Sequence, residues 1–128
     1  HMDPIANMLI MLKNASLVNK ASVVMPHSKM KEAVLALLKE EGYVKAVKVE
    51  GDAKKTIEVA LEYKGKAPRI TGVTRISKSS KRVYTGVKTI APVRYGHGLL
   101  VLSTPKGIMS DKMARKELVG GEVLFSIW

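Results

Sequence analysis

Residues 99–122 read LLVLSTPKGIMSDKMARKELVGGE, and this stretch decides how the second half of the chain folds. Leu99–Leu102 is an apolar run typical of a buried strand, and Gly120-Gly121 marks a turn. Between them Ser110 is a good N-cap for one short helix near Ser110–Leu118. The segment Ser103-Thr104-Pro105-Lys106-Gly107 then forms an exposed turn with two hydroxyls and a lysine. Such a turn can bind phosphates, sugar hydroxyls or base edges without any catalytic group.

The rest of the second half is mostly strand. Its apolar and β-branched segments are bounded by glycine and polar residues, with another turn at Gly96-His97-Gly98. We expect strands at Ile70–Ile76, Val83–Val87, Leu99–Leu102 and Val123–Trp128.

The first half contains two amphipathic helices. Asp3-Pro4 provides a cap and a first helical residue, and a buried stripe follows at Ile5, Met8, Leu9 and Leu12. Ile10 and Met11 lie off that stripe, which hints at a second packed face. After a short strand, Ser22–Met25, the second helix begins at Ser28 and stops at Gly42. Its predicted core side is Met30, Ala33, Val34, Leu37 and Leu38, with the lysines at 29, 31 and 39 projecting elsewhere.

Two further strands, Val44–Val49 and Thr56–Tyr63, complete the first half. The second alternates, with Ile57, Val59, Leu61 and Tyr63 inward. The predicted fold class is α+β in two small modules. Residues 1–64 form an α/β layer with two helices on one face of a short sheet, His1-Met2 being a cloning remnant. A polar boundary at 64–68 leads to a β-rich module over 69–128.

Composition limits the class of protein. A chain of 128 residues that is 46% hydrophobic has enough apolar residues for a core. It has no cysteine, which excludes disulfides and fits a reducing cytosol. No apolar run approaches the ~20 residues that span a bilayer, and no secretion leader precedes the first helix. We therefore expect a cytoplasmic protein.

The positive charge is unevenly distributed. The net charge is +11, yet residues 1–63 hold nine Lys/Arg against eight Asp/Glu. Residues 64–128 hold thirteen against three, and Asp111 is the only acid within 64–116. A basic surface kept for solubility usually mixes both signs. This segregation favours a nucleic-acid partner over a surface kept for solubility. A membrane partner is less favoured than either, because no long basic amphipathic helix is present.

Catalytic constellations are scarce. Besides His1, the histidines are His27 and His97, which lie far apart and have no acidic neighbour in the sequence. Ser103 with His97 would make a nucleophile and base, but no nucleophile-elbow pattern and no orienting acid accompany them. No carboxylates group near a histidine as a zinc site without cysteine would require. We expect no enzyme, no metal and no cofactor.

The candidate binding residues are basic, hydroxyl-bearing or aromatic. Lys54-Lys55 lie at a hairpin tip, although a solvated loop explains them slightly better. In the segment 75–82, basic residues alternate with hydroxyl-bearing ones. The candidates there are Ser77, Lys78 and Arg82, and Tyr84 lies close by in the sequence. Binding and ordinary strand packing explain Tyr84 about equally well. The short helix lacks the Asn or Gln that reads adenine in DNA, so RNA recognised by shape and irregular pairs fits better.

The chain resembles the bacterial ribosomal protein S8 family almost end to end, because a series of matching residues follows the same order along the sequence. The matching residues are Asp3-Pro4-Ile5-Ala6, Lys13-Asn14-Ala15, Arg75-Ile76-Ser77-Lys78, Arg82-Val83-Tyr84, Gly96, Gly98, Ser103-Thr104, Gly107, Ser110-Asp111, Ala114-Arg115, Gly120-Gly121-Glu122 and Trp128.

The resemblance implies a non-enzymatic constituent of the small ribosomal subunit. Members of the family bind the central domain of small-subunit ribosomal RNA directly at an irregular internal loop, early in assembly. They contact neighbouring ribosomal proteins, and some repress translation of their own operon through a messenger RNA that mimics the site. The free protein is expected to be a monomer. A general basic DNA- or RNA-binding regulator is the alternative.

The resemblance also implies which residues meet the RNA. Ser103, Thr104 and Gly107, with Pro105 and Lys106 in the same turn, match the main contact. Tyr84 and Glu122 match positions beside it, and Lys54 and Lys55 match the contact of the first module. Glu122 has two readings: it accepts a hydrogen bond from a base amino group, or it orients a neighbouring hydroxyl.

Four features depart from the family pattern. Ser79-Ser80 replace a common Pro-Gly, which alters the shape of that turn. Leu118 stands where glycine is common, so we expect the helix to run longer before Gly120. His97 occupies a usually apolar place, and Ile10 and Met11 are unusually apolar, which suggests an altered contact to a neighbouring protein.

Overall fold

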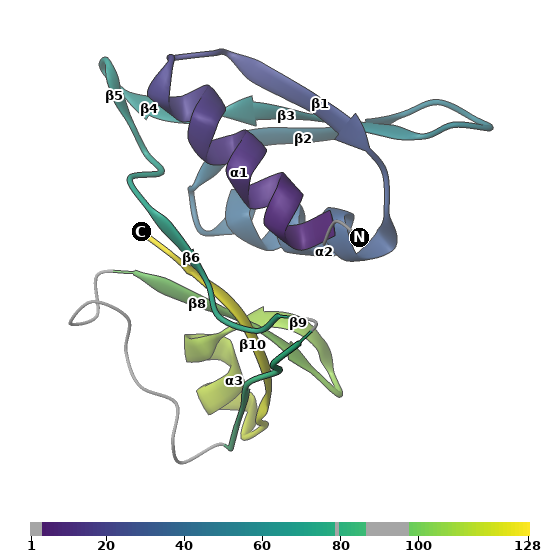
Figure 1. The fold of residues 1–128 in the computed structure, drawn as a ribbon, viewed down its shortest axis with the longest axis vertical. Helices are drawn as coiled ribbons and strands as arrows, with labels where there is room; N and C mark the ends of the chain where they lie inside the picture. Colours follow the sequence, from purple (N-terminus) through teal and green to yellow (C-terminus); the bar gives the residue numbers. More distant parts are fainter. Residues whose placement is uncertain (1–3, 79, 87–97) are drawn as a thin grey trace. The chain divides into compact units, whose positions relative to one another are not determined.

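A computed structural model describes residues 4–78, 80–86 and 98–128 (Figure 1). The chain divides into two compact units, one ending at Thr71 and one beginning at Gly72. The segment 64–68, predicted as a boundary, belongs to the first unit, where β4 (Tyr63–Lys64) pairs with β5 (Ala67–Pro68). The cap expected at Asp3 and the features expected at Ser79, Val87, Gly96 and His97 lie outside the described residues.

The first unit is a helix layer on a three-stranded antiparallel sheet. Its helices are α1 (Pro4–Leu17) and α2 (Lys29–Glu40), and its strands are β1 (Ser22–Pro26), β2 (Val44–Glu50) and β3 (Thr56–Leu61) in the order β1-β3-β2. Ile57, Val59 and Leu61 are buried on β3 while Glu58 between them is exposed. This alternation confirms the predicted inward face at these three positions, which the helices cover. Tyr63, predicted on the same face, is only half-buried and belongs to β4, because β3 already ends at Leu61.

The buried face of α2 differs from the predicted one. Ser28 caps the helix as expected, its hydroxyl accepting a hydrogen bond from the Lys31 amide at 3.1 Å. The buried side chains are Lys31, Val34, Leu35 and Leu38, whereas Met30 and Ala33 are exposed. The stripe therefore follows a spacing of three and four residues that begins at Lys31. A lysine can serve there because its aliphatic stem packs as an apolar chain does.

The second unit is built around its last strand. Its elements are β6 (Val73–Arg75), β7 (Tyr84–Thr85), β8 (Leu99–Thr104), β9 (Gly107–Ser110), α3 (Asp111–Glu117) and β10 (Gly121–Ile127). The sheet order is β6-β10-β8-β9, and β7 also pairs with β10, all antiparallel. The strand β9 was not predicted, because its four residues lie between a turn and a helix cap.

One side of this sheet carries the core of the second unit. Leu102 on β8, Met109 on β9 and Val123 on β10 pack with Ala114 of α3. Asp111, at the first turn of α3, is buried; its carboxylate accepts a hydrogen bond from the Leu100 amide at 3.3 Å and lies 3.4 Å from Arg115 Nη1. The helix is thereby fixed to β8. No described helix is both long and apolar enough to cross a membrane.

The end of α3 differs from the expectation of a longer helix. Ser110 is the N-cap, as predicted, but the helix stops at Glu117. Leu118 adopts the left-handed conformation with φ 56° and ψ 45°, and its amide donates to Ala114 and Arg115 carbonyls. This is the capping geometry that glycine usually occupies. A leucine there is strained, and 74% of it is exposed, so burial offsets little of that strain.

We therefore expect Leu118→Gly to stabilise the protein. Relief of left-handed strain should raise the free energy of unfolding by about 1 kcal/mol, as measured by urea denaturation. The matched control is Glu117→Gly one residue earlier, which lies inside the helix and should lower stability by about 1 kcal/mol. A loss of stability in both variants would contradict the assignment of Leu118 as the cap.

Candidate nucleic-acid interface

Three predicted site residues lie side by side across the second sheet. Glu122 on β10 pairs in register with Ser103 on β8 and with Tyr84 on β7. Directly opposed residues of antiparallel strands point to the same face of a sheet. Ser103, Glu122 and Tyr84 therefore form one row, called here the recognition row. In the sequence, nineteen positions separate Tyr84 from Ser103, and another nineteen separate Ser103 from Glu122.

The recognition row faces away from the core. Its neighbours Leu102 and Val123 point into the cluster with Ala114, and alternation along each strand sends Ser103 and Glu122 to the opposite face. Tyr84 is 68% exposed, so ordinary packing does not explain it. Ser103 is half-buried. The row thus presents a hydroxyl and an aromatic ring on either side of a carboxylate.

The turn next to the row is the tip of a β-hairpin. Thr104 pairs with Gly107, leaving Pro105 and Lys106 as the exposed connecting residues. The Thr104 hydroxyl donates to the Gly107 carbonyl at 2.8 Å and accepts from the Lys106 amide at 3.1 Å. Gly107 has φ +116°, a conformation that side chains rarely adopt. The segment expected as an open turn is therefore closed and stiffened by its own threonine.

A close approach of two strands places the row beside this tip. A side chain at Gly121 would collide with the Ser103 carbonyl oxygen. Glycine at this position therefore lets β10 come near the end of β8. The residues Gly120-Gly121, predicted to mark a turn, thus also have a packing role, since Gly121 is the first residue of β10.

Arg82 joins the row through an ion pair. Its Nη1 donates to both carboxylate oxygens of Glu122, each at 3.2 Å. The Arg82 side chain is 57% exposed and that of Glu122 only 14%. The sequence signalled both residues separately but not their pairing, because forty positions separate them. Opposite charge alone cannot select one arginine among many.

Ser77 and Lys78 lie in the turn that leads to Arg82. Ser77 is 1% exposed. Its hydroxyl accepts from the Val83 amide at 2.9 Å and donates to the Val83 carbonyl at 3.2 Å. Lys78 and Lys81 exchange backbone hydrogen bonds at 2.9 and 3.0 Å, and Lys78 is exposed. Ser77, predicted as a contact residue, is thus an internal clasp of the turn, while Lys78 is at the surface.

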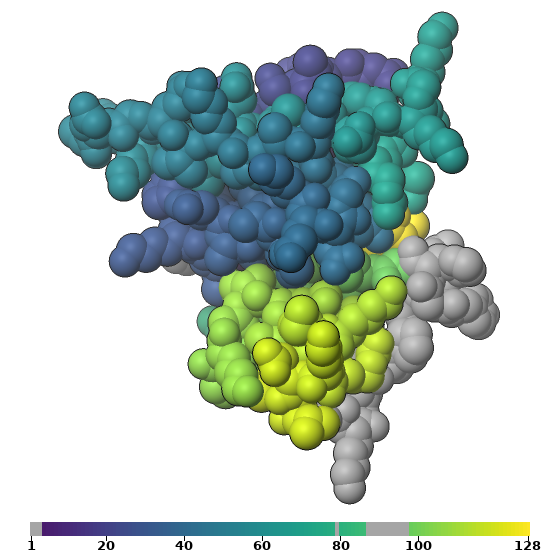
Figure 2. All heavy atoms as spheres, turned by 180° about the vertical axis from the view of Figure 1, so that it is seen from behind, coloured from purple at the N-terminus to yellow at the C-terminus, as the bar shows by residue number. Residues whose placement is uncertain are grey.

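Lys54 and Lys55 belong to the first unit. Both are exposed in the loop that joins β2 to β3, and Figures 1 and 2 show this loop extending beyond the sheet. The Lys55 carbonyl accepts a hydrogen bond from the His27 amide at 3.0 Å, which anchors the base of the loop. Both side chains are therefore accessible to solvent in the loop between β2 and β3.

His27 and Glu32 form a close pair of titratable side chains in the first unit. His27 Nε2 lies 2.6 Å from Glu32 Oε1, so the histidine has an acidic neighbour in space that the sequence did not indicate. The adjacent hydroxyl, Ser28, is committed to capping α2. In the described ranges, no three His, Cys, Asp or Glu side chains are grouped as a metal site would need.

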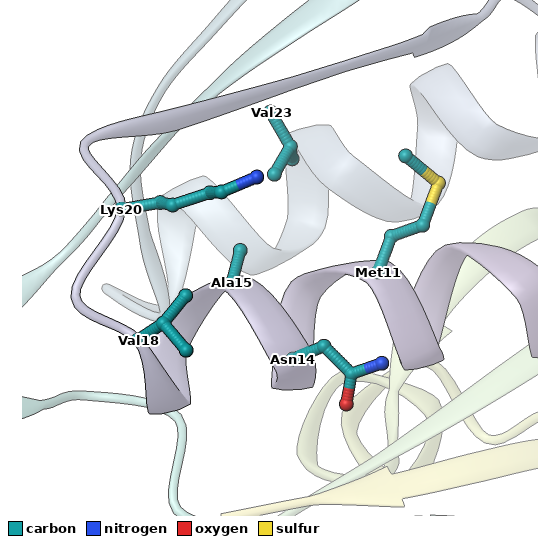
Figure 3. A pocket seen from close by; sticks show the side chains of 6 residues that line it. All are labelled: Met11, Asn14, Ala15, Val18, Lys20 and Val23. Carbon is teal, nitrogen blue, oxygen red and sulfur yellow. The ribbon is translucent and has the colours of Figure 1, made fainter.

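A hollow between α1 and β1 is mostly apolar (Figure 3). Its lining consists of Met11, Asn14, Ala15, Val18, Lys20 and Val23. This lining contains neither a carboxylate nor a histidine, so it offers no acid–base pair. Ile10 is exposed nearby and Met11 is half-buried. The second packed face expected from these two residues is therefore open at Ile10 and only partly covered at Met11 by the described parts of the chain.

Comparison with known proteins gives one consistent result. The family model described as Ribosomal protein S8 matches residues 3–128. Three curated relatives carry the name small ribosomal subunit protein uS8. That of Mesomycoplasma hyopneumoniae (strain 7448) is 48% identical over 98% of this chain and 96% of its own. That of Dechloromonas aromatica (strain RCB) is 50% identical over 95% and 94%. That of Spiroplasma kunkelii is 47% identical over 98% of each.

The hydroxyl of Ser77 stabilises the turn through its two hydrogen bonds to Val83. Ser77→Ala removes both of them and leaves the Val83 amide without its acceptor. The free energy of unfolding should fall by about 1–3 kcal/mol, and amide hydrogen exchange at Val83 should accelerate. The matched control, Ser80→Ala, changes an exposed serine of the same turn and should shift stability by less than about 0.5 kcal/mol. Equal effects of both substitutions would show that the Ser77 hydroxyl has no special role.

Proposed function

The chain belongs to the ribosomal protein S8 family, and from this premise we propose that it binds the central domain of small-subunit ribosomal RNA directly through the recognition row and the adjoining hairpin tip. As a family member it is a structural, non-enzymatic constituent of the small ribosomal subunit. Direct binding early in subunit assembly, in the cytoplasm and as a free monomer, is the finer part of the proposal.

The observation that carries this proposal is the register of Ser103, Glu122 and Tyr84. A hydroxyl and an exposed ring on either side of Glu122 offer a donor, an acceptor and a stacking surface. Regular RNA duplex hides its base edges in a deep, narrow groove, whereas an irregular internal loop exposes bases that can stack and form hydrogen bonds. The row is therefore suited to a loop more than to a regular helix.

Basic residues around the row supply the contacts to phosphates. Lys106 stands at the hairpin tip beside Ser103, and Lys78 and Arg82 lie on the turn before Tyr84. Phosphate contacts of this kind fix register and affinity but carry no sequence information. Lys54 and Lys55, on the first unit, are proposed as a separate phosphate contact.

Two further kinds of partner belong to the proposal. A messenger RNA of its own operon that carries a similar loop would bind the same row, which would repress translation. Neighbouring proteins of the small subunit are proposed to contact other surfaces of the chain. The alternative of a general DNA-binding regulator is less favoured, because the only helix of the basic unit in the described ranges, α3, has seven residues. A major-groove reader needs a helix that can enter the groove.

The first functional prediction compares two RNAs of equal length. A small-subunit RNA fragment with the irregular internal loop should bind more tightly than a regular duplex, as measured by fluorescence anisotropy. Affinity for both should fall steeply with salt, each neutralised phosphate adding roughly 0.7–0.9 to the log–log slope. Equal affinities would contradict specific recognition, and effective competition by duplex DNA would favour the general regulator.

The second functional prediction separates recognition from electrostatics. Replacing Ser103 and Thr104 by alanine should reduce the preference for the loop RNA, because it removes the hydroxyl of the recognition row and the clasp of the hairpin tip. The salt slope should hardly change. Lys55→Ala should do the reverse, lowering affinity for both RNAs and reducing the slope by roughly 0.7–0.9. If both variants lowered the slope alike, the hairpin would be only another electrostatic contact.

A further inference from the structure

An acid at the centre of a surface that attracts phosphates requires an explanation. Glu122 is the middle residue of the recognition row, and an uncompensated carboxylate there would repel RNA. Its side chain is largely covered, and both of its oxygens already accept a hydrogen bond from Arg82 Nη1. The guanidinium, by contrast, is mostly exposed. The group that faces solvent at this point of the row is therefore the cation and not the acid.

We propose that Glu122 is a positioning residue, whose carboxylate holds the Arg82 guanidinium beside Ser103 and Tyr84 so that Arg82 binds a phosphate of the RNA. This inference rests on the proposed RNA-binding function of the row. It replaces both interpretations of Glu122 that the sequence left open. The acid contacts neither a base nor a neighbouring hydroxyl; it acts through the arginine.

The hydrogen bonds of Arg82 leave most of its donors available. In the described part of the chain, every hydrogen bond from the guanidinium uses Nη1. The edge formed by Nη2 and Nε can then receive a phosphate, which arginine binds through two parallel hydrogen bonds. One nitrogen thus anchors the side chain, and two others can face the ligand.

The backbone on both sides of Arg82 is also fixed. Before it, Lys78 and Lys81 exchange two backbone hydrogen bonds. After it, Val83 is held on one side by the buried Ser77 hydroxyl and on the other by the Val123 amide, which donates to the Val83 carbonyl at 2.8 Å. Only the side chain of Arg82 remains to be ordered, and Glu122 does this. Ordering before binding reduces the entropy that a long side chain loses on binding.

A double-mutant cycle on the loop RNA tests the proposal. Arg82→Gln should weaken binding about tenfold and lower the salt slope by roughly 0.7–0.9. Glu122→Gln removes a negative charge but should still weaken binding several-fold and lower the slope similarly, because the guanidinium is no longer held. The double variant should bind within about twofold of Arg82→Gln alone.

Two results would overturn the proposal. If Glu122→Gln binds as tightly as the wild type or more tightly, the acid does not help Arg82. If it weakens binding by the same factor in the Arg82→Gln background, Glu122 contacts the RNA itself. Lys112→Gln is the charge-matched control, since it removes one positive charge from α3 on the other face of the sheet. It should change affinity by less than about threefold and leave the preference for the loop intact.

A measurement without RNA separates this inference from the proposed function. In the free protein, nitrogen-15 relaxation at Arg82 Nε should show an ordered side chain that becomes mobile in Glu122→Gln. Unchanged order in that variant would overturn the positioning role, whatever RNA binds. Failure of the wild type to prefer the loop RNA would instead overturn the proposed function, while this measurement still decides whether Glu122 holds Arg82. Urea denaturation checks that both variants remain folded.

Discussion

The register between β10 and β8 is the constraint on which the second unit depends. Glu122 opposes Ser103 and Val123 opposes Leu102, but Phe125 opposes Val101, so one extra residue is accommodated between Val123 and Phe125. Without this bulge the pairing seen at Phe125 would continue unchanged and place Glu122 opposite Thr104. The bulge therefore selects which hydroxyl faces the carboxylate, as bulges elsewhere redirect side chains near functional sites.

The same strand separates the buried core from the accessible surface. Every residue from Val123 to Ile127 is buried, whereas Gly121 and Glu122 are only half-buried. A strand buried on both faces has little freedom to slip, because a shift of one residue would reverse the direction of its side chains. The accessible end of β10, at Gly121 and Glu122, is therefore held in a fixed register as well. The β8–β9 hairpin and the turn before Tyr84 are attached to this end, so local clasps complete an arrangement that the core has already fixed.

Local chemistry was predictable from the sequence, and long-range pairing was not. Ser28 and Ser110 were recognised as caps because a cap needs only one side chain and the next turn of helix. The prediction of the buried face of α2 was wrong, because Lys31 is a polar residue type but buries its aliphatic stem. The prediction that α3 runs past Leu118 was wrong, because Leu118 adopts the left-handed cap conformation that leucine disfavours and sequence preference does not predict. The resemblance named the residues of the recognition row, yet only the strand register brought Tyr84 and Ser103 beside Glu122.

Ser103 and Thr104 show why residue type alone does not assign roles within such a site. In the sequence they are adjacent hydroxyls in one turn. In the structure Thr104 sits at the last pair of the hairpin, where its hydroxyl binds the Gly107 carbonyl and the Lys106 amide. Ser103 sits one pair further from the tip, on the face shared with Glu122. The Thr104 hydroxyl therefore shapes the tip, and the Ser103 hydroxyl is the one we propose as the RNA contact, just as Glu122 is held within the protein and Arg82 is the proposed contact. In both pairs, one polar group is bound by the protein itself and its neighbour is the one proposed to meet the RNA.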